Sequence, residues 1–379
     1  MATPENTTRV LIAGGGTAGH LVPGLAVAAA LVDAGVAPEE IHFVGSNRGV
    51  EARMVPAAGF ALDEVPSRGL PRSIGPATLK AAWGLLGAAR RGIAIVGARR
   101  PGVVVSLGGH AALPGVVGAV ARRAPLVLME QNVRAGAVNR LLARFARASA
   151  VSFPGTDLRR SRVTGNPLHA DLVAAAEARR GPGGAAARDA ARRELGLPLD
   201  RTVVLVTTGS LGSKRVNDAV LGLVERWAGR DDVAIRHVTG RRDHDAVLAA
   251  APPPGAALQH DVVAYEDRMP LALTAADVAV TRAGAGTCTE LAAFGVPAIM
   301  VPLPIATRDH QAANAGVLAA AGAAVVVPDA ELDVDRLEAE LAPLVADAGR
   351  REAMATAMAG QARLDAAARV AEVILEVAR

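Results

Sequence analysis

Four glycine-rich runs that contain polar or titratable side chains are the segments of this sequence best suited to chemistry. The first is GGGTAGH at residues 14–20, which follows an apolar run and ends at His20, a side chain that titrates near neutrality. Glycines let an anionic ligand approach the backbone, and the N–H groups at the start of a helix favour negative charge. The run therefore predicts an anion-binding loop, and a packing turn without a ligand is the alternative.

A dinucleotide site competes with this interpretation, because the same run matches the pattern GxGxxG. Such a site needs an acidic residue at the end of the second strand to hold the ribose. The apolar run at 41–44 continues instead as GSNR, and no carboxylate appears before Glu51. The sequence therefore disfavours a dinucleotide.

The other three glycine runs also follow apolar runs: SLGGH at 106–110, TGSLGS at 208–213 and RAGAGT at 282–287. The run at 208–213 leads into Lys214 but lacks P-loop spacing, which argues against nucleoside triphosphate hydrolysis. Glu290 lies three residues after Thr287, a spacing that also fits a helix capping box. Two such loops in each half of the chain indicate one ligand with several phosphates or two phosphorylated ligands.

Two polar clusters are further candidates for ligand contacts. Glu130, Gln131 and Asn132 follow the apolar run at 126–129, where polar residues favour binding over core packing. His310 and Asn314 lie one helical turn apart, a pattern that an ordinary polar helix start explains equally well.

Metal binding has little support in the sequence. The DxD patterns at 243–245 and 333–335 lie in a charged turn and at a helix entry, where capping and solvation explain them. No cluster of His, Cys and carboxylates has zinc spacing, and Cys288 has no evident partner. We therefore expect no metal and a small buried cysteine at 288.

The elements that must position these loops alternate regularly along the chain. Strands are expected at 9–13, 41–44, 103–106, 126–129, 148–152, 202–207, 233–238, 277–281, 298–301 and 323–327, with helical patterns between them. Strand, crossover helix and strand build a parallel sheet with both faces buried. The rhythm breaks at 174–193, an Ala-, Arg- and Gly-rich excursion, so a domain boundary is expected near 164–166. Each half is then an α/β domain with its own doubly wound sheet, and ligands bind at the carboxyl ends of the strands.

Composition narrows the class of protein. A chain of 379 residues, 51% hydrophobic and 21% charged, suits two folded domains. Its 2% of aromatic residues leaves little to stack bases in a nucleic-acid groove. A single cysteine forms no internal disulfide, which suggests a reducing, intracellular location. The uncharged runs at 10–32 and 103–121 contain several glycines and a proline, unlike membrane spans.

In their order along the chain, these motifs resemble the MurG family of peptidoglycan N-acetylglucosaminyltransferases. The resemblance spans nearly the whole sequence and includes GNP at 165–167. It implies a GT-B fold: two Rossmann-like domains, an inter-domain cleft and a C-terminal helix that crosses back to the first domain. The implied ranges are 1–164 for the acceptor and membrane-facing domain, 165–355 for the donor domain and 356–379 for the final helix.

The resemblance also implies a reaction, its ligands and their sites. N-acetylglucosamine is transferred with inversion from its uridine diphosphate to the muramoyl 4-hydroxyl of lipid I, giving lipid II, with His20 as the candidate base and no cofactor. The protein then works at the cytoplasmic face of the cell membrane, without nucleic acid. The expected acceptor contacts are Thr17, Ala18, Gly19, Gly108, Gly109, Glu130 and Asn132. The expected donor contacts are Thr17, Gly19, Asn132, His169, Ser210, Arg282, Ala285, Gly286, Thr287, Glu290, His310, Gln311 and Asn314.

Five positions depart from the family pattern and leave two alternatives open. Met129 stands where the family usually has His, Leu211 where it has Gln and His110 where it has Tyr. His169 stands in place of an Arg and His310 in place of a Gln. One alternative is a MurG-like paralogue that moves another sugar to a phosphoglycolipid in antibiotic assembly. The other is a non-catalytic sugar-nucleotide-binding protein.

Membrane contact is expected in the first domain. Leu79, Trp83 and Leu86 follow helical spacing, with basic residues close by, which suits an anionic leaflet. An ordinary core-facing amphipathic helix is the alternative.

Overall fold

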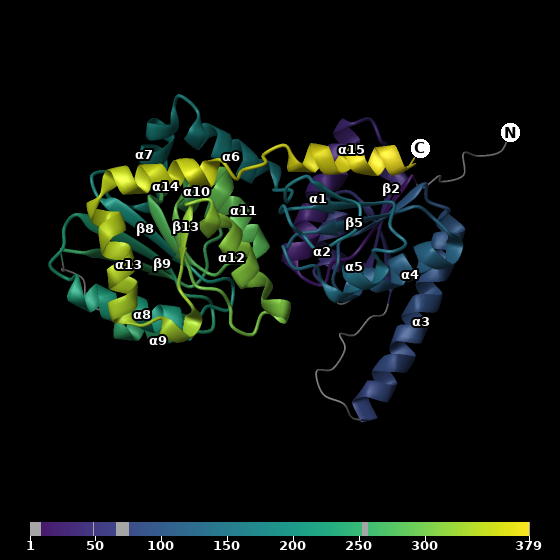
Figure 1. The fold of residues 1–379 in the computed structure, drawn as a ribbon, viewed down its shortest axis with the longest axis horizontal. Helices are drawn as coiled ribbons and strands as arrows, with labels where there is room; N and C mark the ends of the chain where they lie inside the picture. Colours follow the sequence, from purple (N-terminus) through teal and green to yellow (C-terminus); the bar gives the residue numbers. More distant parts are fainter. Residues whose placement is uncertain (1–8, 48, 66–75, 252–256, 379) are drawn as a thin grey trace. The chain divides into compact units, whose positions relative to one another are not determined.

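The computed structural model describes residues 9–47, 49–65, 76–251 and 257–378. The chain divides into two compact units. Unit 1 comprises residues 1–169 and 363–379, and unit 2 comprises residues 170–362. Each unit is a parallel sheet with helices on both faces (Figure 1).

Unit 1 contains, among its described residues, a seven-stranded parallel sheet in the order β3-β2-β1-β4-β5-β6-β7. Its strands are β1 (Val10–Ala13), β2 (Ile41–Ser46), β3 (Ala61–Val65), β4 (Val103–Ser106), β5 (Leu126–Glu130), β6 (Ala148–Val151) and β7 (Ser161–Val163). Its helices are α1 (Ala18–Asp33), α2 (Glu51–Ala57), α3 (Pro76–Arg99), α4 (Leu113–Arg122), α5 (Ala137–Leu142) and α15 (Ala366–Ala378). The strand order reverses between β1 and β4, so the loops after these two strands lie side by side at the place where such sheets bind ligands.

Alternate residues of β1 build the two cores of unit 1. Val10 and Ile12 pack with α1 and α15, and Leu11 and Ala13 pack with α3 and α4. This period of two, with both faces apolar, is what a sheet covered on both sides requires.

The C-terminal helix α15 belongs to the core of unit 1. Its residues Val370 and Ile374 are buried, and the helix packs along α1. Helix α14 ends before this return, and the chain passes from unit 2 back to unit 1 at residues 362–363. Val10 and Val370, which are 360 positions apart in sequence, therefore share one hydrophobic core.

Unit 2 contains, in the part of the chain described, a six-stranded parallel sheet in the order β10-β9-β8-β11-β12-β13. Its strands are β8 (Thr202–Thr207), β9 (Val233–Val238), β10 (Gln259–Val263), β11 (Val278–Thr281), β12 (Ala298–Met300) and β13 (Ala324–Val326). Its helices are α6 (Ala170–Arg180), α7 (Gly184–Leu195), α8 (Lys214–Arg226), α9 (His244–Ala250), α10 (Met269–Ala275), α11 (Ala285–Phe294), α12 (His310–Ala320), α13 (Val334–Ala346) and α14 (Ala348–Ala359).

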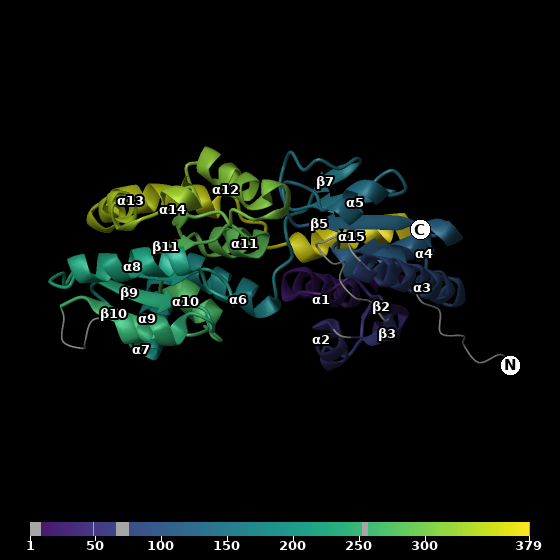
Figure 2. The ribbon, with the colours of Figure 1, turned by 90° about the horizontal axis from the view of Figure 1, so that it is seen from below.

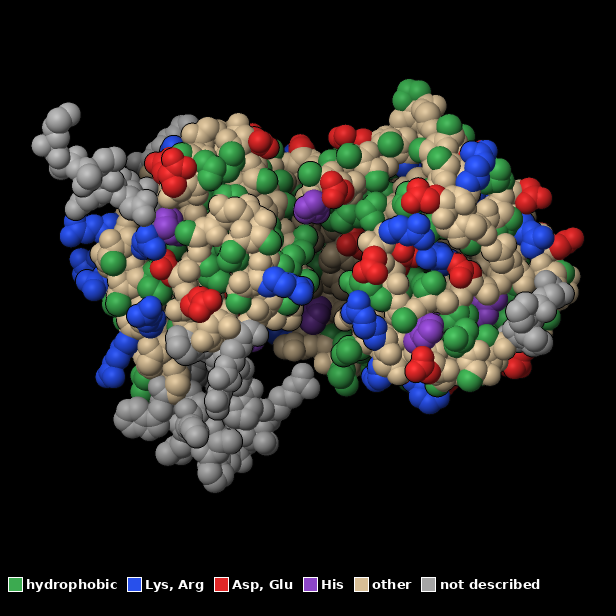
Figure 3. Space-filling model, turned by 180° about the vertical axis from the view of Figure 1, so that it is seen from behind, with side chains coloured by type: hydrophobic (Ala, Val, Ile, Leu, Met, Phe, Trp, Pro, Cys, Tyr) green, Lys and Arg blue, Asp and Glu red, His purple; other side chains and the backbone are tan. Residues whose placement is uncertain are grey.

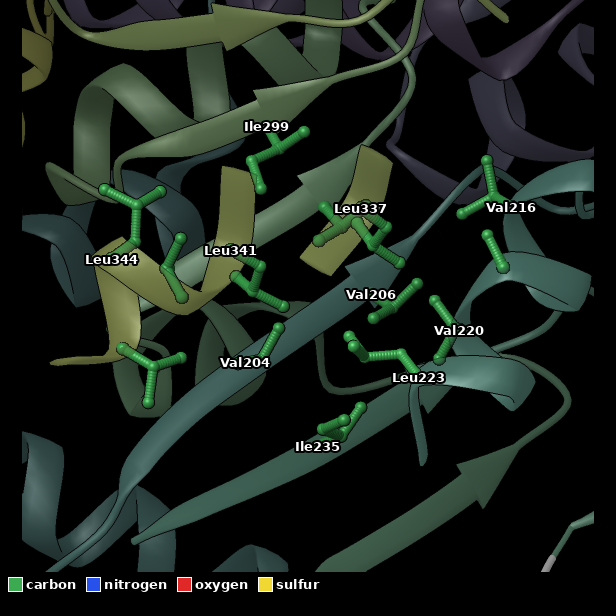
Figure 4. Packing of buried hydrophobic residues seen from close by; sticks show 14 of the residues in the cluster. Val204, Val206, Val216, Val220, Leu223, Ile235, Ile299, Leu337, Leu341 and Leu344 are labelled. Carbon is green, nitrogen blue, oxygen red and sulfur yellow. The ribbon is translucent and has the colours of Figure 1, made fainter. Parts of the chain in front are cut away.

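One face of this sheet carries a core that is mainly aliphatic and also contains Trp227 and Met354. Val204 and Val206 of β8 meet Leu223 of α8 and Leu337 and Leu341 of α13 (Figure 4). Figure 2 shows the helices of unit 2 layered around its sheet. This core holds the strands in place, and the loops of unit 2 extend from the ends of these strands.

The excursion expected at 174–193 is helical. It forms parts of α6 and α7, which pack on α10. Arg179 donates to the carbonyl oxygens of Leu273 (2.9 Å) and Ala276 (2.8 Å), and burial lowers its pKa to about 10. Arg192, only 3% exposed, pairs with Asp277 at 2.5 Å. These arginines therefore close the carboxyl end of α10, which explains their use in a stretch without β-branched residues.

The apolar length of the helices and the distribution of surface charge are the two properties relevant to membrane contact. None of the helices in the described ranges has the combination of length and apolar character that crossing a membrane requires. On the face of unit 2 shown in Figure 3, basic side chains lie among acidic ones. The described part of that face is therefore mixed in charge.

Candidate active site

The first glycine loop joins β1 to α1 and brings His20 into the first turn of the helix. Helix α1 begins at Ala18, directly after Thr17, and Pro23 lies inside the helix. The Thr17 hydroxyl lies 3.0 Å from His20 Nδ1. If Nδ1 carries the hydrogen and donates it to Thr17, then Nε2 has the lone pair that a general base needs.

The loop after β4 packs directly against this histidine. A Cβ atom added to Gly108 would lie 3.6 Å from His20 Cδ2, and one added to Gly109 would lie 3.8 Å from His20 Nε2. Both glycines have positive φ values, 80° and 70°. These φ values favour glycine at both positions, and the backbone of the pair lies within van der Waals reach of the His20 ring. His110 lies near Gly16 in the same way, with Cε1 3.4 Å from an added Cβ.

Glu51, at the start of α2, stabilises the first glycine loop through hydrogen bonds. Its fully buried carboxylate accepts the N–H of Gly16 at 2.9 Å and that of Ser46 at 2.7 Å. A Cβ on Gly15 would lie 2.7 Å from its carboxyl carbon. The carboxylate that a dinucleotide site would direct at a ribose is thus engaged with the loop itself.

Glu130, at the end of β5, organises the loop that follows it. Its carboxylate accepts the N–H groups of Asn132 (3.1 Å) and Gly136 (2.9 Å) and the side-chain amide of Asn139 (3.1 Å). Asn139 in turn accepts the Ser106 hydroxyl at 3.0 Å, and the same hydroxyl oxygen accepts the N–H of Gly108 at 3.2 Å. A buried chain of hydrogen bonds therefore links Glu130 to the Gly108 loop.

Gln131 and Asn132 complete this cluster. Gln131 is buried and lies 3.4 Å from the Leu107 carbonyl oxygen, whereas Asn132 is half-buried. Of the three residues, Asn132 is the one whose side chain is most open to a ligand. Glu130 is suited to positioning it.

In unit 2, the start of α11 has the features of an anion site. Gly284 precedes the helix and brings no side-chain oxygen to the N–H groups of Ala285, Gly286 and Thr287. These first-turn donors have no partner within the helix, and they carry the positive end of its dipole. Thr287 does not cap the helix, so the capping box is not formed with Glu290.

Glu290 lies one turn further along α11 and is half-buried. Burial raises its pKa to about 6. A carboxylate held in partly desolvated surroundings gains most from a ligand that brings hydroxyl donors to it.

Arg282, which precedes Gly284, joins three loops of unit 2. Its guanidinium donates to Ser213 Oγ at 2.6 Å and to the carbonyl oxygens of Val301 and Pro302 at 3.0 and 3.1 Å. It also pairs with Asp329 at 2.7 Å. The charge of Arg282 is therefore largely used in holding the loops after β8, β11 and β12 together.

Gln311 and Asn314 of α12 hold the peptide group of Ala283. Gln311 Oε1 accepts the N–H of Ala283 at 3.2 Å and that of Leu303 at 2.9 Å, and Asn314 donates to the Ala283 carbonyl at 3.2 Å. His310 donates through Nδ1 to the Thr307 carbonyl at 2.8 Å, which leaves its Nε2 as the acceptor in the neutral ring. Arg308 and Asp309, just before it, both have positive φ values, near 55°. Such strain in non-glycine residues commonly marks a functional loop.

Ser210 is exposed in the loop after β8, next to Leu211, which is 68% exposed. The strand order places this loop beside the start of α11. Ser210, Arg282, the α11 amides, Glu290 and the α12 residues thus gather at the carboxyl ends of neighbouring strands. The remaining candidate, His169, is exposed at the end of unit 1.

Three further expectations concern membrane contact, the cysteine and metal binding. Leu86 is 53% exposed on α3, and the side chains of Leu79 and Trp83 lie outside the described residues. Cys288 is buried as expected, and burial raises its pKa to about 12. Within the described ranges, no group of three His, Cys, Asp or Glu residues has the arrangement of a metal site.

Comparison with known proteins identifies the family. Residues 10–151 match the Glycosyltransferase family 28 N-terminal domain and residues 203–370 match the C-terminal domain of that family. A relative from Nocardioides sp. is 42% identical over 97% of this chain and 98% of its own length, and one from Alkalilimnicola ehrlichii is 41% identical over 98% and 100%. Both are named UDP-N-acetylglucosamine–N-acetylmuramyl-(pentapeptide) pyrophosphoryl-undecaprenol N-acetylglucosamine transferase. This chain belongs to the MurG family.

The solved structures agree with this membership. The crystal structure of Acinetobacter baumannii MurG is 26% identical, with a TM-score of 0.76 over 97% of this chain and 99% of that one. The expected GT-B fold, with two Rossmann-like domains, is therefore confirmed.

Several residues that hold the loops of this candidate site are not singled out by the sequence. From the sequence, Glu51 is only a carboxylate that comes too late in the chain to hold a ribose, and Asn139 lies between two expected strands with no motif around it. Asp329 and Gly240 also contribute, the latter packed against Gly212 with a positive φ of 85°. Buried polar residues next to glycine loops were the available signal, but sequence spacing does not reveal which loop each one supports.

Proposed function

We propose that this chain transfers N-acetylglucosamine, with inversion, from UDP-N-acetylglucosamine to the 4-hydroxyl of the muramoyl sugar of lipid I, giving lipid II. The observation that carries the proposal is the match of almost the entire chain to curated MurG-family transferases of that name. In the reaction the acceptor oxygen forms the new bond to the sugar C1, the bond to the diphosphate breaks, and uridine diphosphate leaves. The hydroxyl proton goes to a base.

His20 is the proposed base, and unit 1 is the proposed acceptor unit. Thr17 orients the imidazole, and the Gly108 and Gly109 backbone lies against it without side chains. Ala18, Gly19 and Asn132 are the proposed contacts to the acceptor around this ring. Removing a proton in the transition state contributes about 10²–10⁴-fold to the rate of such reactions.

Unit 2 is the proposed donor unit. The N–H groups of Ala285, Gly286 and Thr287 would face the diphosphate, with Ser210 beside them, and Glu290 would accept the ribose hydroxyls. The imidazole Nε2 of His310 is directed to the sugar in this proposal. Gln311, Asn314 and Arg282 hold the loops that carry these contacts.

Charge stabilisation on the departing diphosphate is assigned to the start of α11. Preorganised N–H donors and a helix dipole act on developing negative charge without reorganising. We therefore propose that the reaction needs no added divalent metal. The prediction is that a chelator leaves the initial rate unchanged.

Membrane contact is proposed for α3 of unit 1. Ala88, Ile95 and Val96 in its second half are buried, whereas Leu86 is exposed and Arg90 and Arg91 lie beside it at the surface. An apolar side chain with a basic rim suits an anionic leaflet. The proposed location is the cytoplasmic face of the cell membrane.

A donor panel tests the sugar-nucleotide part of the proposal. Saturating UDP-N-acetylglucosamine should raise the melting temperature, because a ligand at 100 times its Kd stabilises by about 2.7 kcal/mol. A larger shift with another nucleotide sugar would favour the antibiotic-assembly alternative. A shift with no transfer to any acceptor would favour a binding protein.

A further inference from the structure

Three polar side chains beneath the loops of unit 2, two of them buried and the third, His260, half-buried, form one connected chain of hydrogen bonds. His260 lies on β10, His237 on the neighbouring β9 and Asn217 in the first turns of α8. His260 Nε2 is 3.3 Å from His237 Nδ1, and His237 Nε2 is 3.0 Å from Asn217 Oδ1. His237 is fully buried and Asn217 is 1% exposed. Burying two imidazole rings costs free energy of folding unless their nitrogen atoms form hydrogen bonds.

The direction of every hydrogen bond in this chain is determined. The Asn217 amide nitrogen donates to the Thr239 carbonyl at 3.1 Å and to Asp243 Oδ2 at 3.3 Å, and neither of these groups can donate. Asn217 Oδ1 is therefore the atom that faces His237, so His237 Nε2 carries the hydrogen. His237 Nδ1 is then the acceptor, and His260 donates to it.

Both rings are neutral at physiological pH. Burial lowers the pKa of His237 to about 3 and that of His260 to about 4. Each ring therefore keeps one hydrogen, and the chain has a single arrangement of donors and acceptors.

This series of hydrogen bonds ends at the turn of residues 239–243, which supports the loop that carries Ser210. A Cβ on Gly212 would lie 2.0 Å from the Thr239 carbonyl oxygen, and one on Gly240 would lie 2.1 Å from the Gly212 nitrogen. The Arg241 N–H donates to the Ser210 carbonyl at 3.2 Å. The two backbones are thus in direct contact, and a shift of the turn at 239–243 must move the loop at 209–212.

We infer that His237 is a positioning residue for the nucleotide-sugar loop, acting through Asn217 on the turn at 239–243 and so on Ser210. This inference rests on the proposed donor role of unit 2. His237 does not touch the ligand in this scheme. It fixes the position of the backbone that carries Ser210, the proposed contact beside the diphosphate.

The inference separates two isosteric replacements of His237. In H237Q the side-chain amide nitrogen reaches the position of Nε2 and can still donate to Asn217. In H237N the amide reaches only the position of Nδ1, so Asn217 loses its donor. N217D tests the next link, because its carboxylate still accepts from His237 but cannot donate to Thr239 and is repelled by Asp243. His42, a buried histidine on β2 of unit 1 whose pKa burial also lowers, provides the matched control H42Q.

Steady-state kinetics on the full chain, with donor and acceptor varied separately, is the first test. H237N and N217D should raise the donor KM about tenfold and leave the acceptor KM within twofold. H237Q and H42Q should stay within twofold of wild type in both. A donor KM unchanged in folded H237N and N217D, or an H237Q as impaired as H237N, overturns the inference.

Hydrogen exchange of the same proteins without ligand is the second test. In H237N and N217D, peptides covering 208–213 and 239–243 should exchange at least tenfold faster, with the rest of unit 2 unchanged. Exchange that rises uniformly across unit 2, or not at all in these peptides, overturns the inference. Failure of the proposed function would look different, because wild type would then bind no nucleotide sugar while the exchange result still stands.

Discussion

Replacing Glu290 with glutamine is expected to stabilise the protein while weakening its donor site. Burial raises the pKa of this carboxyl from 4.5 to about 6, so the folded state binds the proton more tightly than the unfolded state. The group therefore favours folding at low pH, and that contribution is lost as pH rises through 4.5 to 6. A difference of this size costs the folded protein about 2 kcal/mol above pH 6.

The glutamine variant has no charge to desolvate. E290Q should be more stable than wild type by up to about 2 kcal/mol at pH 7.5, and the difference should shrink toward zero near pH 4.5. Donor binding should move the opposite way. Exchanging a charge-assisted hydrogen bond for a neutral one costs about 1 kcal/mol, or roughly a fivefold rise in the Kd for UDP-N-acetylglucosamine.

Urea unfolding and calorimetric titration at pH 5, 6 and 7.5 measure both effects. Wild-type donor affinity should fall as pH drops below 6, whereas that of E290Q should be nearly independent of pH. The matched control is E352Q, at an exposed glutamate on α14, which should change neither quantity. An E290Q protein less stable than wild type at pH 7.5, or one with the wild-type pH profile, would refute the assignment of a desolvated ribose-binding carboxylate.

Three further predictions concern the proposed base, the buried ion pair between Arg192 and Asp277, and the membrane contact. H20A should lower kcat by about 10²–10⁴-fold with the donor Kd within twofold of wild type, as measured by transfer assays and calorimetry; equal loss of donor binding would contradict the role of base. D277A should destabilise by about 3–5 kcal/mol in urea unfolding because it leaves a buried guanidinium unpaired, whereas R369A, which removes an exposed pair, should cost under about 1 kcal/mol. L86S should reduce co-sedimentation with anionic vesicles while leaving the melting temperature unchanged; undiminished binding would remove this side chain from the contact.

The inner strands could be predicted from the sequence, whereas three edge strands could not. All ten expected strands are present, namely the nine inner strands and the edge strand β13. The inner strands are predictable because central parallel strands are apolar on both faces and form continuous β-branched runs. The three strands that the sequence does not predict are β3, β7 and β10. Each lies at an edge of its sheet and is largely or partly exposed. These three strands have no such run, and pairing with an existing neighbour decides their structure.

The site could be predicted as loops but not as a network. Glycine runs that follow apolar runs could be placed at the carboxyl ends of strands, since that relation depends on local sequence. Which carboxylate or amide supports which loop depends on contacts between residues far apart in the chain. Glu51 beneath Gly16 and Asn217 beside Thr239 are such contacts. Arg282 illustrates the converse, because the sequence suggests a donor contact, whereas in the structure its guanidinium pairs with Asp329.

Product formation from defined substrates tests the central claim most directly. The purified chain, given UDP-N-acetylglucosamine and a short-chain lipid I analogue in the presence of a chelator, should form one product, heavier than the acceptor by one N-acetylhexosamine. Its new linkage should be β, as inversion of the α-linked donor requires. Transfer of a different sugar, or none from any nucleotide sugar despite tight binding, would contradict the account.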